Sequence, residues 1–207
     1  MKRAPFTSRL YMLKRTGGVR QAARDAGGVR MSLRLRPALC RLTRDLRGRL
    51  EGLSRVVQEV KDTMRGRAPE TLSSLEQAGL LHYLRVFYAG VEDILLRIVA
   101  EVDCFSFSGK EWGRELLWRM TLDLPRVRPA ILSPALFARL EAYRTFTAHA
   151  RLPYGPLAPA PEQLFDLVLS LPDIYAGFAA EIETLLDYLW RTAECEDAEG
   201  QTVVGRE

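Results

Sequence analysis

The sequence predicts an all-α protein, an up-and-down bundle of about five helices. Two long segments, residues 38–65 and 71–102, carry apolar residues at spacings of three and four, the period of an amphipathic helix. The alternation of apolar and polar residues that is typical of β-strands is missing from the sequence. Because each long segment has one apolar stripe to bury, we expect the two to pack as antiparallel neighbours.

Three shorter helical segments are expected in the second half of the chain. Residues 111–122 contain apolar side chains at helical spacing. The next helix begins at Ser133, a capping hydroxyl followed by a proline, and ends before Pro153. The last spans residues 161–190 and is expected to bend at Pro172.

Length and composition favour one domain with an appendage at each end. The chain has 207 residues, of which 47% are hydrophobic and 27% charged, the profile of a globular protein. We expect a basic, flexible arm at 1–30, a helical domain at 31–193 and an acidic, polar tail at 194–207. No apolar run approaches the roughly 18–20 residues of a membrane span, and basic residues interrupt every candidate signal peptide. We therefore expect a cytoplasmic protein that does not contact membranes.

The N-terminal quarter of the chain is strongly basic. Residues 1–50 contain fourteen Lys and Arg against two Asp and Glu. Such a segment can contact the phosphate backbone of RNA without sequence preference. Alternatively, the protein starts at Met31, and residues 1–30 are an upstream extension.

Cysteine and histidine are too sparse and too scattered to predict a metal site. Cys40, Cys104 and Cys195 form no CxxC pair, and the chain has two histidines and no HExxH motif. We expect reduced thiols, no metal and no cofactor.

A candidate site lies in the stretch AYRTFTAHARLPYG, residues 142–155. On a regular helix Arg144 and His149 are about 140° apart, so they can converge only near a helix end, which Pro153 provides. Arg151 lies seven residues after Arg144, on the same face. Two guanidinium groups and an imidazole are suited to binding a phosphodiester and moving a proton.

Structural roles for the same residues are the alternatives. His149 can interact with the helix dipole, and Arg144 can be a surface cation. His82 is expected in the core or an interface, as are Trp112, Trp118 and Trp190. Tyr88 either packs in the core or lines a cleft together with Glu92. Arg126 and Arg128 lie in the segment 125–132, which its prolines predict to be extended, and they either contact phosphate or are solvated.

The hexapeptide RTFTAH resembles the R-x4-6-H motif of the HEPN superfamily of α-helical, mostly ribonucleolytic domains. The runs at 84–99, 111–120 and 125–132 are similar to HepT toxins in order and spacing, and the resemblance covers about residues 35–190. It implies a homodimer in which two R-x4-6-H helices form a composite cleft that cleaves RNA without metal. Arg144 and His149 are then the catalytic residues, and Arg126, Arg128 and Arg151 bind RNA.

HepT toxins pair with nucleotidyltransferase antitoxins of the MNT type. In many of them the motif continues to R-x4-H-x-Y, and the antitoxin adds AMP to that tyrosine. This chain has Arg151 in the matching place, so Tyr154 is the candidate AMP acceptor. Two other functions stay open: a catalytically inactive HEPN module that binds a nucleotidyltransferase or nucleic acid, and a helical dimeric scaffold.

Overall fold

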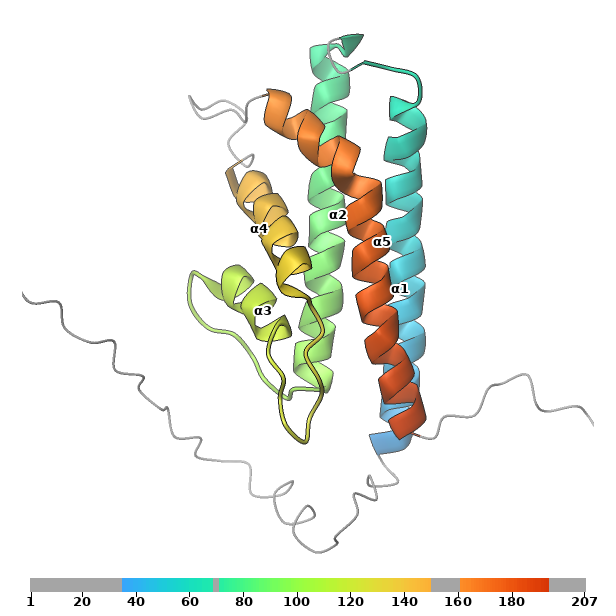
Figure 1. Ribbon diagram of the computed structural model, residues 1–207, viewed down its shortest axis with the longest axis vertical. Coiled ribbons are helices and arrows are strands. Elements are labelled where there is room, and N and C mark those ends of the chain that lie inside the picture. Colours follow the sequence, from blue (N-terminus) through green and yellow to red (C-terminus); the bar gives the residue numbers. More distant parts are fainter. Residues whose placement is uncertain (1–34, 69–70, 150–160, 194–207) are drawn as a thin grey trace, which may run out of the picture.

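The computed structural model describes residues 35–68, 71–149 and 161–193, which form five helices (Figure 1). These helices are α1 (Leu35–Met64), α2 (Ser74–Glu101), α3 (Trp112–Met120), α4 (Pro134–His149) and α5 (Pro161–Thr192). Within the described ranges the only β-type pairing is an isolated bridge between Leu124 and Arg128. The prediction of an all-α bundle of about five helices is confirmed.

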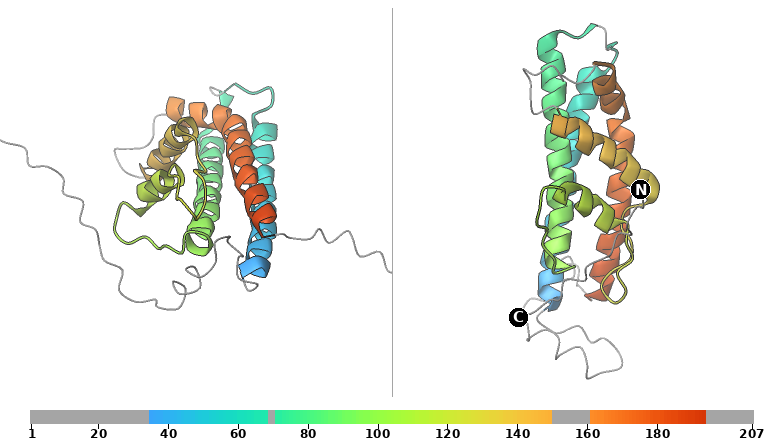
Figure 2. Two further views of the ribbon diagram at one scale, coloured as in Figure 1. Left: turned by 60° about the horizontal axis from the view of Figure 1, so that its bottom comes forward. Right: turned by 90° about the vertical axis from the view of Figure 1, so that its left-hand side faces the viewer.

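The three long helices α1, α2 and α5 run side by side, and the shorter α3 and α4 cover one flank (Figures 1 and 2). α1 packs on α2 and α5, whereas α3 and α4 pack on each other and on α2. α2 therefore joins the other two long helices to α3 and α4. One continuous hydrophobic core joins all five helices.

The apolar stripe predicted for the first helix is the face of α1 that the bundle buries. Its members at 42, 46, 50, 53, 57 and 60 are each at most 6% exposed. The second helix begins later than expected, at Ser74 rather than at residue 71. Ser73 and Glu76 form a capping box, in which Ser73 Oγ accepts from the Glu76 N–H and the Glu76 carboxylate accepts from the Ser73 N–H. This capping box fixes the start of α2 at Ser74.

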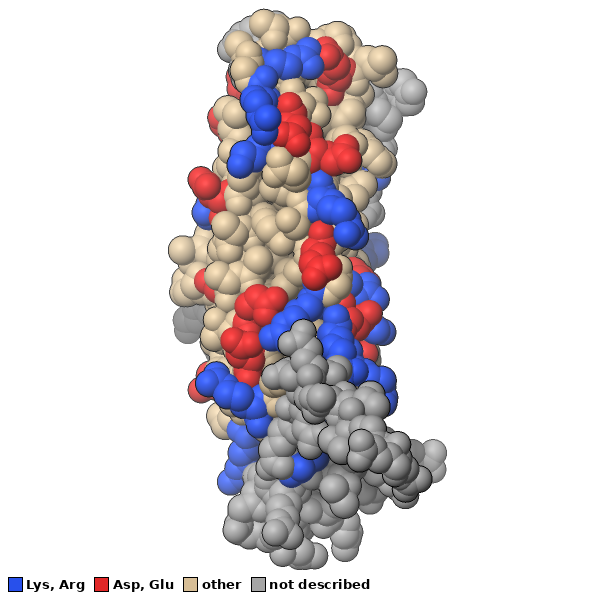
Figure 3. Space-filling model, turned by 90° about the vertical axis from the view of Figure 1, so that its right-hand side faces the viewer, with Lys and Arg blue, Asp and Glu red and all other residues tan. Residues whose placement is uncertain are grey.

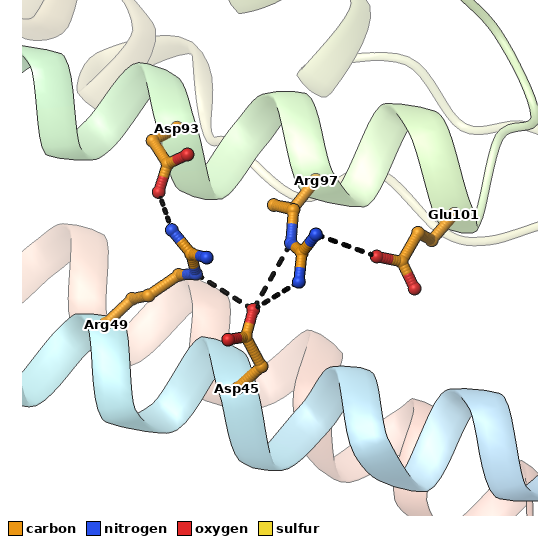
Figure 4. A network of polar contacts seen from close by, with 5 residues as sticks. All are labelled: Asp45, Arg49, Asp93, Arg97 and Glu101. Atoms are coloured by element: carbon orange, nitrogen blue, oxygen red, sulfur yellow. Dashed lines mark hydrogen bonds and ion pairs between the residues drawn. The ribbon is translucent and has the colours of Figure 1, made fainter.

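Gly90 brings α1 and α2 into close contact. A Cβ atom at this position of α2 would lie 2.4 Å from Leu53 Cδ2 of α1, so only glycine fits without movement. At the solvent edge of the same interface, ion pairs link the two helices (Figure 4). Arg49 donates to Asp45 at 2.8 Å and also to Asp93, and Arg97 donates to Asp45 at 3.0 Å.

Charges of both signs alternate on the face formed by α1 and α5 (Figure 3). Arg47 donates to Glu183 at 3.1 Å and to Asp187 at 2.9 Å. The guanidinium groups of Arg44 and Arg47 each lie 5.8 Å from the ring centroid of Trp190. This face is therefore not a surface of one sign.

Residues 125–127, between α3 and α4, form a turn, so the prediction that the segment 125–132 is extended was wrong for this first part. Arg126 has a φ of +68°, and the Leu124 N–H donates to the Arg128 carbonyl at 2.9 Å. Proline fixes its own φ and restricts the residue before it, so Pro125 and Pro129 leave residues 126 and 127 free to turn. In contrast, α5 continues through Pro172 and changes direction in its first half, as expected (Figure 1).

Two further expectations concern the cysteines and the membrane. Cys104 is a free, exposed thiol, but Cys40 is disulfide-bonded, which corrects the expectation of reduced thiols. Distance along the sequence does not limit which cysteines meet in a fold. In the part of the chain that the structure describes, no helix combines the length and the apolar character that a membrane span requires.

Candidate functional site

Arg144 lies on the side of α4 that faces α2 and α3, and Glu141 holds its guanidinium. Arg144 Nε and one terminal nitrogen donate to the two Glu141 carboxylate oxygens, each at 2.7 Å. Only about a quarter of each side chain is exposed, 24% for Arg144 and 25% for Glu141. The hydrogen bonds to Glu141 raise the pKa of Arg144, so the guanidinium stays charged. Its other terminal nitrogen makes no hydrogen bond to described residues and can still donate to a ligand.

Tyr88 of α2 contributes a buried hydroxyl beside Arg144. The residue is 4% exposed, and its hydroxyl oxygen has no hydrogen-bond partner among the described residues. Burial raises the pKa of Tyr88 far above its usual range, the charge of Glu92 adds to this, and that of Arg144 opposes it. Tyr88 is therefore a neutral donor, and an unsatisfied donor in a buried position is costly unless a ligand or water uses it. Tyr88 therefore has a buried ring whose hydroxyl lies near the Glu92 carboxylate. Whether the two residues line a cleft stays a prediction.

Gly113 lets α3 approach the same point. A Cβ atom here would lie 3.4 Å from Glu92 Oε1 and 3.6 Å from Arg144 Cδ. The backbone of α3 therefore lies against both side chains, and the site is bounded by α2, α3 and α4. We call Tyr88, Glu92, Gly113, Glu141 and Arg144 the Arg144 site.

The Arg144 site is acidic as far as the structure describes it. Glu141 pairs with Arg144, Glu92 lies against Gly113, and Glu111 also raises the pKa of Arg144 through its charge. One guanidinium thus faces three carboxylates. A phosphodiester needs further cations here, and the sequence offers Arg151 and a second copy of Arg144.

His149 is the last residue of α4, whose range is Pro134–His149. Its side chain, and all of Arg151 and Tyr154, fall outside the part that the structure describes. The convergence of Arg144 with His149 and Arg151 therefore stays a prediction, as does the AMP-acceptor role of Tyr154. Within the described residues no group of three or more His, Cys, Asp or Glu side chains could hold a metal ion.

The two linker arginines have opposite environments. Arg126 is exposed, as a phosphate contact requires. Arg128 is 2% exposed and donates to both Asp103 carboxylate oxygens, at 2.7 and 3.0 Å. It also donates to the carbonyls of Leu122 and Pro129. Because all of these partners are internal, Arg128 holds the turn in place and has no surface to offer RNA.

Sequence reasoning missed some contributors to the site. The i,i+3 spacing of Glu141 and Arg144 could have indicated their ion pair, but no pattern indicated that Gly113 lies against Arg144. His82 and Trp118 were each expected in the core or in an interface. His82 is exposed and Trp118 is 57% exposed, so neither is a core residue, and the interface alternative stays a prediction.

The fold and this helix define a class of protein, because an all-α bundle with an R-x4-H sequence on α4 is typical of HEPN domains. A sequence model of the family described as HepT-like protein matches residues 79–189, from α2 into α5 and including Arg144 and His149. The chain therefore belongs to the HepT-like proteins of the HEPN superfamily, a family of HEPN-type toxins. Searches of curated proteins and of solved structures found no match.

Proposed function

We propose that the protein is a HepT-like toxin that cleaves RNA without metal through Arg144 and His149. The observation that supports this most directly is the environment of Arg144. Three helices hold it beside the buried hydroxyl of Tyr88, and one of its terminal nitrogens has no partner among the described residues. An arginine that serves only as a solvated surface charge needs no such contacts with three helices.

The proposed reaction is transfer of the RNA phosphoryl group to the neighbouring 2′-oxygen. His149 accepts the 2′-hydroxyl proton or protonates the leaving 5′-oxygen, since an imidazole can exchange protons near neutral pH. The 2′-oxygen bonds to phosphorus as the bond from phosphorus to the 5′-oxygen breaks, and a cyclic phosphate and a 5′-hydroxyl result. Arg144 stabilises the charge that builds on the phosphorane oxygens.

We propose further that the active form is a homodimer. The three carboxylates around Arg144 disfavour a phosphodiester in a single copy. A cleft shared by two copies places two Arg144 and two Arg151 side chains near one phosphate. Arg126 and the basic residues 1–30 then contact the RNA backbone beyond the cleft.

The proposed partner is a nucleotidyltransferase antitoxin in the cytoplasm. It transfers AMP to Tyr154, and the added phosphate competes with RNA for the nearby arginines. Tyr154→Phe should leave cleavage intact but abolish neutralisation by the partner. Loss of cleavage in Tyr154→Phe would instead place the phenol in the catalytic machinery.

The decisive test is RNA cleavage in EDTA by the purified full chain. His149→Ala and Arg144→Ala should each lower the rate by about a hundredfold to ten-thousandfold, because each removes a group that acts in the transition state. Arg139→Ala is the matched control, since Arg139 is an exposed arginine of the same helix. Equal cleavage by the wild-type protein and His149→Ala would refute the nuclease.

The second candidate is a catalytically inactive HEPN module that binds the nucleotidyltransferase. The bidentate ion pair between Arg144 and Glu141 favours this binding function, because Glu141 competes with phosphate for the guanidinium. A stable complex with the nucleotidyltransferase, together with no cleavage in EDTA at any protein concentration, would select this function.

A further inference from the structure

A shallow hollow lies on the outer face of α3, away from the core. Glu111, Arg114, Glu115 and Trp118 line it, at the i, i+3, i+4 and i+7 positions that share one face of a helix. α3 is on the outside of the bundle, toward the viewer in the right-hand view of Figure 2. At about 220 Å³ the hollow is smaller than the roughly 300–1,000 Å³ of pockets that enclose a drug-sized ligand, so it suits a single ring system.

Trp118 gives the hollow an aromatic wall. The residue is 57% exposed, more than any other large aromatic side chain of the described residues. A tryptophan is rarely so exposed without a partner, and an indole face is a platform on which nucleobases stack. Its two neighbours on the α3 surface, Arg114 and Glu115, are both exposed.

The charges around the hollow select among ring systems. The carboxylates of Glu111 and Glu115 accept hydrogen bonds, and the amino groups of adenine, cytosine and guanine donate them. Uracil has a carbonyl acceptor in place of the amino group and can donate only through its ring N–H, so it offers the two carboxylates fewer donors. Arg114 and Lys110, both exposed, balance the two carboxylates, so this face does not repel a phosphate backbone.

The hollow and the Arg144 site adjoin the same part of α3. Arg114 directly follows Gly113, whose backbone lies against the Arg144 side chain. Glu111 lines the hollow and also acts on the pKa of Arg144. The two places are thus separated by about the width of one helix, roughly 10 Å.

We propose that the α3 hollow is a nucleobase subsite, in which an amino-bearing base of the RNA stacks on Trp118 and donates to Glu111 or Glu115. The choice of RNA as ligand rests on the proposed ribonuclease function. The subsite gives that function a base preference at a nucleotide near the cleaved bond, which the Arg144 site alone does not provide.

The test measures RNA binding separately from cleavage. The full chain carrying His149→Ala is titrated into fluorescein-labelled oligoadenylate and oligouridylate ten nucleotides long, and anisotropy reports binding. Adding Trp118→Ala should weaken oligoadenylate binding by about five- to 150-fold, the range of one lost stacking contact. Trp118→Phe keeps an aromatic face and should weaken it less. Glu115→Gln should reduce the preference for oligoadenylate over oligouridylate.

Leu169→Ala is the matched control, since Leu169 is 59% exposed but lies on α5. It should leave both affinities unchanged. Equal affinity of Trp118→Ala and its parent for oligoadenylate would overturn the subsite, as would binding of neither oligonucleotide. If Trp118→Ala instead abolishes only a complex with the nucleotidyltransferase, the hollow is a protein-docking surface and the proposal is wrong.

The two proposals fail in different experiments. If the wild-type protein cleaves RNA in EDTA but Trp118→Ala changes neither KM nor base preference, only the subsite fails. If oligoadenylate binding depends on Trp118 and no cleavage occurs, the ribonuclease fails and the subsite stands.

Discussion

Arg144 donates two hydrogen bonds of 2.7 Å to the carboxylate of Glu141, one helical turn before it on α4. The pair links a residue of the R-x4-H motif to a carboxylate outside the motif. Both side chains are about three-quarters buried, at 24% and 25% exposure, so the contact is less screened than a surface ion pair. Glu141 therefore fixes the orientation of the Arg144 guanidinium.

The first prediction concerns this ion pair. Glu141→Ala should lower the free energy of unfolding by about 1 kcal/mol, because it leaves a partly buried guanidinium without its partner. Urea denaturation measures the change. Asp62→Ala breaks an ion pair of the same i,i+3 spacing, with Arg65, that is far more exposed, at 51% and 72%. Asp62→Ala should lower the free energy of unfolding much less than Glu141→Ala. Equal losses in the two variants would show that burial does not strengthen the pair of Glu141 and Arg144.

The second prediction compares two buried tyrosine hydroxyls. Tyr88→Phe should keep or raise stability, because it removes a buried hydroxyl that has no partner among the described residues. Tyr143→Phe should cost about 1 kcal/mol, since the Tyr143 hydroxyl donates to the Leu167 carbonyl. Thermal unfolding compares the two variants. A large loss in Tyr88→Phe would mean that the hydroxyl has an internal partner.

The third prediction is a loss of stability at alkaline pH. Burial raises the pKa of Tyr143 to about 12 and that of Tyr88 further, whereas an unfolded tyrosine titrates near 10. Above pH 10 the unfolded chain loses these protons first. The free energy of unfolding should therefore be constant up to about pH 9 and fall above pH 10, by about 1.4 kcal/mol per pH unit for each group. The double variant Tyr88→Phe, Tyr143→Phe should show a much smaller decline in urea denaturation at pH 9 to 11.

The fourth prediction distinguishes the two linker arginines. Arg128→Ala should destabilise the protein by about 3–5 kcal/mol, because it leaves the fully buried carboxylate of Asp103 with only Arg119 as a partner. Arg126→Ala, two residues away and exposed, should change stability by no more than about 0.5 kcal/mol. Chemical denaturation tests both. Comparable stability of the two variants would contradict a structural role for Arg128.

The fifth prediction tests the close approach of α1 and α2. Gly90→Ala should destabilise the bundle by about 1–3 kcal/mol, because its methyl group overlaps Leu53 in a packed core. Gly79→Ala, in the same helix, meets nothing within 4 Å and should stabilise it by about 0.5–1 kcal/mol. Opposite signs in thermal unfolding are the expected result. Stabilisation by both substitutions would show that Leu53 moves aside without cost.

The helices themselves could be predicted from the sequence by local rules. The stripe from Leu42 to Val60 is spaced for one face of a helix, and the buried face of α1 is that stripe. Ser133 and Pro134 mark the start of α4, where the Leu136 N–H donates to Ser133 Oγ at 3.2 Å. These signals lie within a few residues of each other, so the sequence alone contains them.

The environment of each site residue was decided only by the tertiary structure. Arg126 and Arg128 look alike in the sequence, but packing of the turn against Asp103 buries one and exposes the other. Trp118 follows the buried Leu116 and Leu117, yet α3 covers one flank of the bundle and turns its indole to solvent. Periodicity reports which face of a helix is apolar, whereas contacts between residues far apart in the chain depend on which helices meet, and that is a property of the whole packed bundle.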